Sequence, residues 1–297
     1  MPRLINFTVG GEFDDKKLNV FLRSGARLSY SLVSTLRRTD GALLKNGCRT
    51  RTVDTVLEGD IITVSLPDGK LSVEPVKIPF DIMFEDDDIL IINKSPDIAM
   101  HPSHGHQTDT LANGVAWHLL NRGHSGAFMA VGRLDKGTSG IVVCALNSYC
   151  ASLLSGNVQK TYTALCDGVP AGGGVVDAPI FRPDPDKTLR SCRHGAPLLE
   201  SERAVTHYEV IESRGSMSLI RLRLETGRTH QIRVHMAFIG FPLVGDTLYG
   251  SGIEGVGRHM LHCSNVCFEH PITKKAMSFC APLPSDFKKA FSKQTSL

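Results

Sequence analysis

The chain has 297 residues, 41% hydrophobic and 21% charged. This balance is ordinary for a folded globular protein. It contains no run of eighteen apolar residues and no apolar signal-peptide core at its start, so we expect no membrane span and a cytoplasmic location. The eight cysteines are scattered along the chain, and without a secretion signal we expect them to be reduced.

The formal net charge is only +3, but the charge is unevenly distributed. The segment from Lys16 to Arg51 holds nine basic residues and one acidic residue, Asp40, and therefore carries +8. Subtracting +8 from the total of +3 leaves −5 for the rest of the chain. A small basic module beside a near-neutral body is typical of a protein that binds nucleic-acid phosphate.

The first predicted unit covers residues 14–66. Apolar residues recur at helical spacing around Leu18–Leu22 and Leu28–Leu36. The turn signal Asp40-Gly41 then precedes a short strand within Ala42–Gly47, and Ile61–Val64 is a second strand. Two short helices followed by a hairpin form a compact module, and the turn-rich stretch 67–80 is the predicted linker.

The second predicted unit covers residues 81–291 and is rich in strands. We expect strands within Asp88–Lys94, Ile141–Ala145 and Leu219–Leu224, and a helix at Leu111–Leu120. Several polar or small-residue stretches are predicted to be exposed: the acidic turn 86–88, the glycine run 172–174 and the proline-rich stretch 179–185. The pattern therefore indicates a strand-rich body attached to a small N-terminal module.

The segment Val131–Gly140 places one carboxylate, Asp135, in a fixed polar frame. On an extended strand Arg133 and Asp135 would share a face, and the small residues that follow form a tight turn. The later segment 224–235 supplies basic groups that would keep such a carboxylate ionised. If that segment is a strand, Arg228 and His230 share one face, whereas Arg233 lies at odd spacing from both and falls on the other.

Together these segments resemble the RluA-type pseudouridine synthases, whose motifs are an Arg-Leu-Asp-x-x-Thr-Ser-Gly loop and a Gly-Arg-Thr-His-Gln-Ile-Arg strand. The Lys-x-Tyr-x-Ala frame around Tyr162 and the stretch from Asn93-Lys94 to His101-Pro102-Ser103 also match that family. The first unit resembles the αL RNA-binding fold, named for a small-subunit ribosomal protein, which precedes many catalytic domains of this type.

The resemblance implies an α+β fold, with a mixed, mainly antiparallel central sheet and a small N-terminal domain. It also implies isomerisation of uridine to pseudouridine in structured RNA, without cofactor or metal. Asp135 would be the catalytic carboxylate, Arg233 its basic partner and Tyr162 the ring packed against the target base, while Arg133 would fill the space of the displaced nucleotide. Lys94 and His101 become candidates for RNA contact. The further RNA-binding residues it implies are Arg228 and His230 in the body, and Arg37, Arg38, Lys45, Arg49 and Arg51 in the first unit. We expect a monomer.

Simpler structural roles remain open for these residues. Asp135 could cap its own turn, Arg233 could bind phosphate, and Tyr162 could be core filling. At the level of function, the alternatives are a catalytically silent RNA-binding or ribosome-assembly protein and a hydrolase with Asp135 as nucleophile. Gly132 stands where many members have histidine, from which we expect altered packing. Ribosomal RNA, of the large subunit, is the expected target, and transfer RNA stays open.

Overall fold

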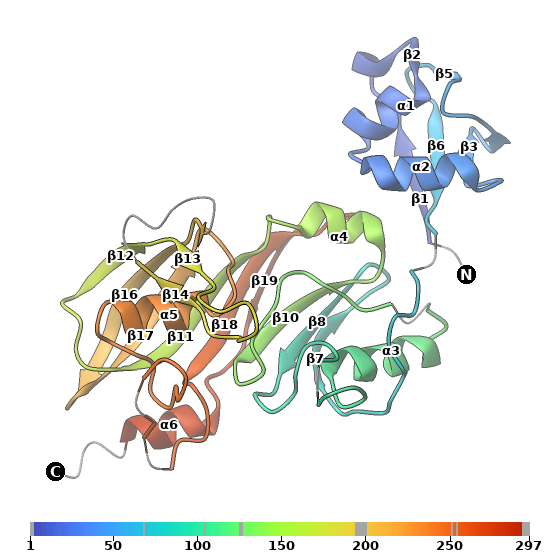
Figure 1. Ribbon diagram of the computed structural model, residues 1–297. Coiled ribbons are helices and arrows are strands. Elements are labelled where there is room, and N and C mark those ends of the chain that lie inside the picture. Colours follow the sequence, from blue (N-terminus) through green and yellow to red (C-terminus); the bar gives the residue numbers. More distant parts are fainter. Residues whose placement is uncertain are drawn as a thin grey trace.

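The computed structural model describes two units joined by a short connection (Figure 1). None of the helices it describes is long and apolar enough to cross a membrane. The described residues are 3–67, 69–103, 105–124, 127–193, 201–250, 252–253 and 255–292.

The N-terminal unit is built on a four-stranded antiparallel sheet of order β1-β6-β3-β4. β1 precedes residue 14, where the sequence predicted this unit to begin, and pairs along its whole length with β6. The helices and hairpin strands predicted within 14–66 are confirmed. The elements are β1 (Leu4–Thr8), η1 (Gly11–Phe13), β2 (Lys16–Lys17), α1 (Leu18–Val20), η2 (Phe21–Gly25), α2 (Tyr30–Arg38), β3 (Leu43–Lys45), β4 (Cys48–Arg49), β5 (Thr55–Val56) and β6 (Ile61–Ser65).

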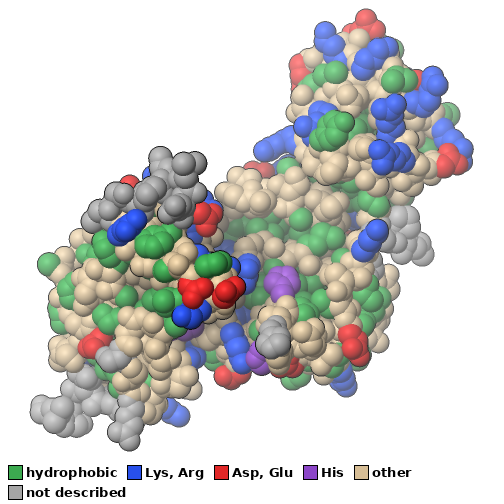
Figure 2. All heavy atoms as spheres, viewed as in Figure 1, with side chains coloured by type: hydrophobic (Ala, Val, Ile, Leu, Met, Phe, Trp, Pro, Cys, Tyr) green, Lys and Arg blue, Asp and Glu red, His purple; other side chains and the backbone are tan. Residues whose placement is uncertain are grey.

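Helix α2 is the amphipathic element of this unit. Ser29 caps its start by accepting the backbone N–H of Leu32 at 3.2 Å, which satisfies one of the free donors of the first turn. The helix buries Leu32 and Leu36, whereas Arg37 and Arg38 end it on the exposed side. Lysine and arginine side chains are spread over the visible face of this unit (Figure 2).

The body is formed by a large twisted sheet of order β12-β16-β17-β11-β18-β10-β8-β7, with β19 on β18 and β9 on β10. Among the described strands, β10 and β18 pair in parallel and the others are antiparallel, which confirms the predicted α+β class. The strands are β7 (Asp81–Glu85), β8 (Ile89–Lys94), β9 (Met129–Ala130), β10 (Ser139–Ala145), β11 (Gln159–Asp167), β12 (Gly173–Asp177), β13 (Ile180–Phe181), β14 (Ser191–Cys192), β15 (Ser201–Glu202), β16 (Val205–Arg214), β17 (Met217–Leu224), β18 (Leu261–Glu269) and β19 (Ala276–Cys280).

Burial along the strands follows their position in the sheet. β8 and β10 are almost continuously apolar because they are covered on both faces, and all of β10 is buried. β17 alternates: Ile220 and Leu222 point into the core, while Arg221 and Arg223 are exposed. The helices of the body are α3 (Leu111–Asn121), α4 (Ser148–Leu154), α5 (Gln231–Phe238) and α6 (Ser285–Ser292).

The two units meet at a buried ion pair rather than only through the connection. Arg3 donates from Nε and Nη2 to the two carboxylate oxygens of Asp88, at 3.0 and 2.7 Å. Tyr149 on α4 donates its hydroxyl to the carbonyl of Ala26 at 2.9 Å, and Phe7 packs edge-on against its ring. The prediction that 86–88 is a solvated turn is therefore wrong for Asp88, which is 3% exposed.

Two further loop predictions are only partly right. Gly173 and Gly174 belong to β12, which pairs with β16 at the edge of the large sheet. Ile180 and Phe181, inside the stretch predicted to be a proline-rich loop, form β13 in a small three-stranded sheet. β12 is an edge strand, whereas β13 is the central strand of its small sheet but has only two residues, too few to show period-two alternation.

Candidate active site

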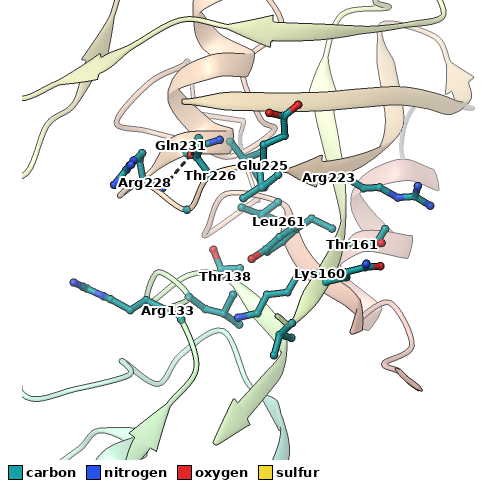
Figure 3. Close-up of a pocket in the computed structure, with 18 of the residues that line it drawn as sticks. Arg133, Thr138, Lys160, Thr161, Arg223, Glu225, Thr226, Arg228, Gln231 and Leu261 are labelled. Atoms are coloured by element: carbon teal, nitrogen blue, oxygen red, sulfur yellow. Dashed lines mark hydrogen bonds between the residues drawn. The ribbon is translucent and has the colours of Figure 1, made fainter. Parts of the chain in front are cut away.

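A cleft of about 880 Å³ lies in the body at the concave side of β11, β17 and β18. It is lined by the loop before β10, by β11, and by the segment that runs from the end of β17 into α5 (Figure 3). The residues that line it include six of the eight predicted for the body, namely Arg133, Asp135, Tyr162, Arg228, His230 and Arg233, but not Lys94 or His101. The structure thus brings together side chains that are up to 100 residues apart in sequence.

Asp135 is carried by a loop, residues 131–138, and not by a strand. Its own carbonyl accepts the backbone N–H of Thr138 at 3.0 Å, which closes the turn. Two cations hold the next two carbonyls: Lys94 Nζ donates to Lys136 O at 3.0 Å, and Arg258 Nη1 to Gly137 O at 2.9 Å. Because consecutive carbonyls are held, the backbone on the C-terminal side of the carboxylate is fixed.

This arrangement corrects the expectation for Lys94. The side chain is 1% exposed and also donates to the carbonyls of Ser95 and Ile98, at 2.8 and 2.9 Å. Burial, then the charge of Arg258, lowers its pKa to about 7. Lys94 therefore supports the loop of Asp135 from behind and is not available for RNA contact.

Gly140 shows why this motif ends in glycine. Its φ is +107°, and a Cβ at this position would lie 2.2 Å from the backbone oxygen of Cys263, where β10 pairs with β18. Any larger residue would force these two strands apart.

The segment after β17 is a tight turn followed by a helix, and its prediction as a strand is wrong. His230 adopts a left-handed conformation (φ +57°) and forms the N-cap of α5, which carries Arg233 in its first turn. Histidine is among the residues that enter this region more readily. On a regular strand, Arg233 would lie on the opposite face from Arg228 and His230. Because the chain turns here instead, all three side chains line the same cleft.

Arg233 lies between two carboxylates. Its Nε and Nη2 donate to the two oxygens of Asp246 at 2.7 and 2.8 Å, and its Nη1 donates to Oδ2 of Asp135 at 3.2 Å. Burial opposes the charge, but the hydrogen bonds and charge of Asp246, followed by those of Asp135, outweigh it and raise the pKa of Arg233. The guanidinium stays protonated and orients Asp135 as predicted.

His230 is the second group on the same carboxylate oxygen. Its Nε2 lies 3.9 Å from Oδ2 of Asp135, while its Nδ1 is 2.8 Å from the hydroxyl of Tyr249. That hydroxyl accepts the backbone N–H of Arg190, so its own proton can be donated to Nδ1. Burial lowers the pKa of His230 and keeps the ring neutral near pH 7. Among the described residues, none donates a hydrogen bond to Oδ1 of Asp135.

Tyr162 lies on β11 between Leu222 of β17 and Cys263 of β18. It is 7% exposed, and burial raises the pKa of its hydroxyl well above the ordinary value, so the ring is neutral. A flat, neutral ring that reaches the cleft from a strand can pack against an uncharged base.

The surroundings of Gly132 explain why this chain has glycine where many family members have histidine. It has φ +81°, and a Cβ there would lie 2.9 Å from Nζ of Lys160. Lys160 is held in that space because it donates to the carbonyl of Val131 at 2.9 Å. The sequence predicts altered packing at this position, and the side chain of Lys160 fills the space that a larger residue at position 132 would occupy.

The arginines at the edge of the cleft differ in their partners. Arg228 pairs with Glu202 at 2.7 Å, whereas Arg133 and Arg223 have no acidic partner among the described residues. In Figure 3, Arg133 and Arg228 extend toward one end of the cleft and Arg223 toward the other. Arg223 was not predicted, although the period-two alternation of β17 already placed it opposite the core.

The predicted basic residues of the N-terminal unit also fall into two groups. Arg49 pairs with Asp40 at 2.8 Å, Arg51 with Asp54 at 3.4 Å, and Lys45 with Asp60 at 3.6 Å. Arg37 and Arg38 are exposed and have no acidic partner among the described residues. The cleft does not include any of these five side chains.

Sequence reasoning missed the groups behind the cleft. Asp246 holds Arg233, Tyr249 stacks on the same guanidinium at 5.1 Å, and His259 contacts Thr138 Oγ1 at 2.9 Å. All three lie in loops, where periodicity gives no signal. A buried arginine needs hydrogen-bonding partners, and Asp246 supplies two of them.

Comparison with known proteins agrees with this geometry. The family model of RNA pseudouridylate synthase matches residues 88–238. The uncharacterised RNA pseudouridine synthase YjbO of Bacillus subtilis is 39% identical over 272 residues, which cover 88% of this chain and 94% of that protein. The ribosomal large subunit pseudouridine synthase D of Vibrio parahaemolyticus is 38% identical, with 83% of this chain and 81% of that protein covered.

A solved structure shares the fold. Human RNA pseudouridylate synthase domain containing 4 superposes with a TM-score of 0.59 at 24% identity, over 72% of this chain and 93% of that chain. The chain belongs to the RNA pseudouridylate synthase family, as its motifs predicted, and is an enzyme of that class.

Proposed function

We propose that this enzyme converts specific uridines of large-subunit ribosomal RNA to pseudouridine, with Asp135 as the reactive carboxylate. The observation that carries the proposal is the environment of Asp135 in the cleft. Arg233 and His230 both face Oδ2, and Oδ1 has no hydrogen-bond donor among the described residues. The choice of RNA rests on relatives such as the Vibrio parahaemolyticus and Vibrio cholerae proteins, which are named for the large ribosomal subunit.

The reaction breaks the bond between N1 of uracil and C1′ of the ribose, turns the base, and joins C5 to C1′. C5 loses a proton and N1 gains one, so the product is an isomer of the substrate. A carboxylate with one oxygen hydrogen-bonded to a cation and the other without a donor among the described residues is suited to begin this sequence, as a nucleophile or as a base. The nucleotide must first leave its stack, at a cost of a few kcal/mol.

The other cleft residues have roles consistent with that step. Tyr162 packs against the uracil ring, Arg133 occupies the space left by the flipped nucleotide, and Arg228 and His230 contact the RNA beside it. The N-terminal unit, residues 14–66, acts as an αL-type RNA-binding domain joined by the linker 67–80 to the catalytic domain, residues 81–291. Neither cofactor nor metal is needed, and the enzyme works as a cytoplasmic monomer.

Pseudouridine mapping on total RNA from a deletion strain tests this function. The strain is complemented with wild type, with Asp135→Asn, or with Asp177→Asn as a matched exposed control. We expect sites in large-subunit ribosomal RNA that are lost in the deletion and restored by wild type and the control only. Equal restoration by Asp135→Asn would exclude this carboxylate. Loss of sites in transfer RNA alone would move the substrate there, and no change at all would favour the silent RNA-binding alternative.

A further inference from the structure

Asp246 does not line the cleft, yet it makes the strongest contacts of Arg233. Its side chain is fully buried, and besides the guanidinium it accepts the backbone N–H groups of Leu248 and Tyr249 at 3.1 and 3.3 Å. We propose that Asp246 is a positioning residue that keeps Oδ1 of Asp135 free to react, by preventing Arg233 from pairing with both oxygens of Asp135. This inference rests on the proposed role of Asp135.

The shape of the guanidinium decides how Arg233 can contact a carboxylate. An arginine beside a carboxylate readily forms a two-pronged pair with both oxygens, because its N–H groups form a planar fork. Here the fork of Nε and Nη2 is occupied by Asp246, so Arg233 cannot turn that edge toward the cleft. What remains for Asp135 is a single contact from Nη1 to Oδ2, at the longer distance of 3.2 Å.

The ring beneath the guanidinium fixes its plane. Tyr249 stacks with its centroid 5.1 Å from the guanidinium carbon of Arg233, and its hydroxyl is held by Arg190 and His230. The guanidinium is thus held on one edge by Asp246 and on one face by Tyr249. Rotation toward Asp135 would break two short charge-assisted hydrogen bonds and the stacking contact together.

The charges favour the same conclusion. Within this group one cation, Arg233, serves two carboxylates, while burial lowers the pKa of both His230 and His259 and keeps these rings neutral near pH 7. The burial of Asp246 would favour its protonation, but the hydrogen bonds and charge of Arg233 outweigh it and lower the pKa of Asp246. Asp135 therefore shares its counter-ion with a second carboxylate and is not fully neutralised by it.

The first test is the crystal structure of Asp246→Asn. An asparagine keeps the shape but has one acceptor oxygen and no charge, so Nε–H and Nη2–H can no longer each bond to an oxygen of their own. We expect Arg233 to turn toward the cleft and to place two N–H groups within about 3 Å of both oxygens of Asp135. If Arg233 keeps its place and Asp135 keeps one contact, the proposal is wrong. This result does not depend on which RNA is the substrate, so failure of the proposed function would be seen separately.

The second test is the single-turnover rate constant on an RNA fragment that spans a mapped site. For Asp246→Asn we expect a fall on the order of 10- to 100-fold, the usual range for a group that orients a reactive one, with an RNA concentration for half-saturation within about threefold of wild type. A merely structural role would lower the amplitude or the melting temperature and leave the rate constant of the folded enzyme unchanged. That outcome would overturn the proposal.

The matched control is Asp88→Asn. Asp88 is also buried and receives Nε and Nη2 of an arginine, Arg3, but it lies outside the cleft at the junction of the two units. We expect a similar loss of stability and an unchanged single-turnover rate constant. An equal fall in both variants would show that instability, not positioning, causes the effect, and would also overturn the proposal.

Discussion

Two arginine–aspartate forks of nearly the same geometry lie in different regions of this enzyme. At the junction, Arg3 donates from Nε and Nη2 to Asp88 at 3.0 and 2.7 Å. At the cleft, Arg233 donates from the same two atoms to Asp246 at 2.7 and 2.8 Å. The carboxylate is buried in both cases, so the forks differ not in the pair itself but in where the remaining N–H groups point.

At the junction the remaining nitrogen, Nη1 of Arg3, lies 3.8 Å from Asp87, a side chain that is 77% exposed. At the cleft the corresponding Nη1 of Arg233 points to Asp135, and the arginine side chain is only 9% exposed. The same arginine–aspartate geometry can therefore join two parts of a fold or present a fixed donor to a reactive group. The surroundings decide which of these it does.

The largest effect on activity should come from a change at Arg233 that removes the two-pronged pair with Asp246 but keeps the positive charge. A lysine at position 233 offers one compact ammonium group that cannot hold both oxygens of Asp246 and also reach Asp135. We expect Arg233→Lys to lower kcat/KM by about 100- to 1000-fold, the range for loss of one preorganised donor. Arg221→Lys, on an exposed pair with Glu209, is the control and should match wild type. A loss of less than about tenfold would show that charge alone suffices at this position.

Removing the arginine of the junction fork should affect stability and not chemistry. Arg3→Met would leave Asp88 buried with Asn147 as its remaining side-chain amide donor. We expect the free energy of unfolding to fall by about 3 kcal/mol, the low end for a broken buried pair because Arg3 is 35% exposed. Urea unfolding measures this loss, and single-turnover assays should give the rate constant of wild type. A slower rate constant in the folded variant would contradict the division of roles between the two forks.

The sequence predicted Arg233 of the cleft fork but neither partner of the junction fork as a buried contact. Arg233 and Asp135 follow from two separate motifs, and the strands of the core follow from their apolar runs. Asp246 and Arg3 could not be predicted, because each lies in a loop or terminal segment whose contacts depend on how distant elements pack. The run Asp86–Asp88 shows the same limit: composition indicates a solvated turn, yet Arg3, 85 residues away, makes Asp88 a buried anchor.

The error at Arg233 has a different physical origin. The family motif predicts a strand at residues 227–233, although the chain turns at His230 through a left-handed conformation. A single residue with positive φ leaves no trace in hydrophobic periodicity, because it changes direction without changing composition. The site residues were therefore identified by their motif, while their arrangement around Asp135 required the structure.

The Arg233–Asp246 pair at the cleft also differs from the Arg3–Asp88 pair because histidine side chains lie close to it. Burial, then the charge of Arg233, lowers the pKa of His259 to about 4, compared with about 6.5 in an unfolded chain. Between these values the unfolded state binds more protons, so stability is complete above about pH 6.5 and is lost as the pH falls toward 4. We expect a loss on the order of 2 kcal/mol over this window in urea unfolding. His259→Gln should flatten the dependence there, and an unchanged slope would contradict this assignment.

Arginines without an acidic partner in the described part of the chain complete the comparison, and they should give the smallest effect. Arg37 and Arg38 are exposed at the end of α2, so each can neutralise a phosphate without breaking an ion pair. Replacing both with glutamine should weaken RNA binding by about three- to tenfold, lower the salt dependence of log K by about 1.5, and leave kcat unchanged. Lys274→Gln, whose lysine faces Glu269 at 3.7 Å, is the control. If the double variant keeps the salt dependence of wild type, this face of the N-terminal unit does not bind the RNA backbone, and the cleft arginines alone would have to provide the affinity.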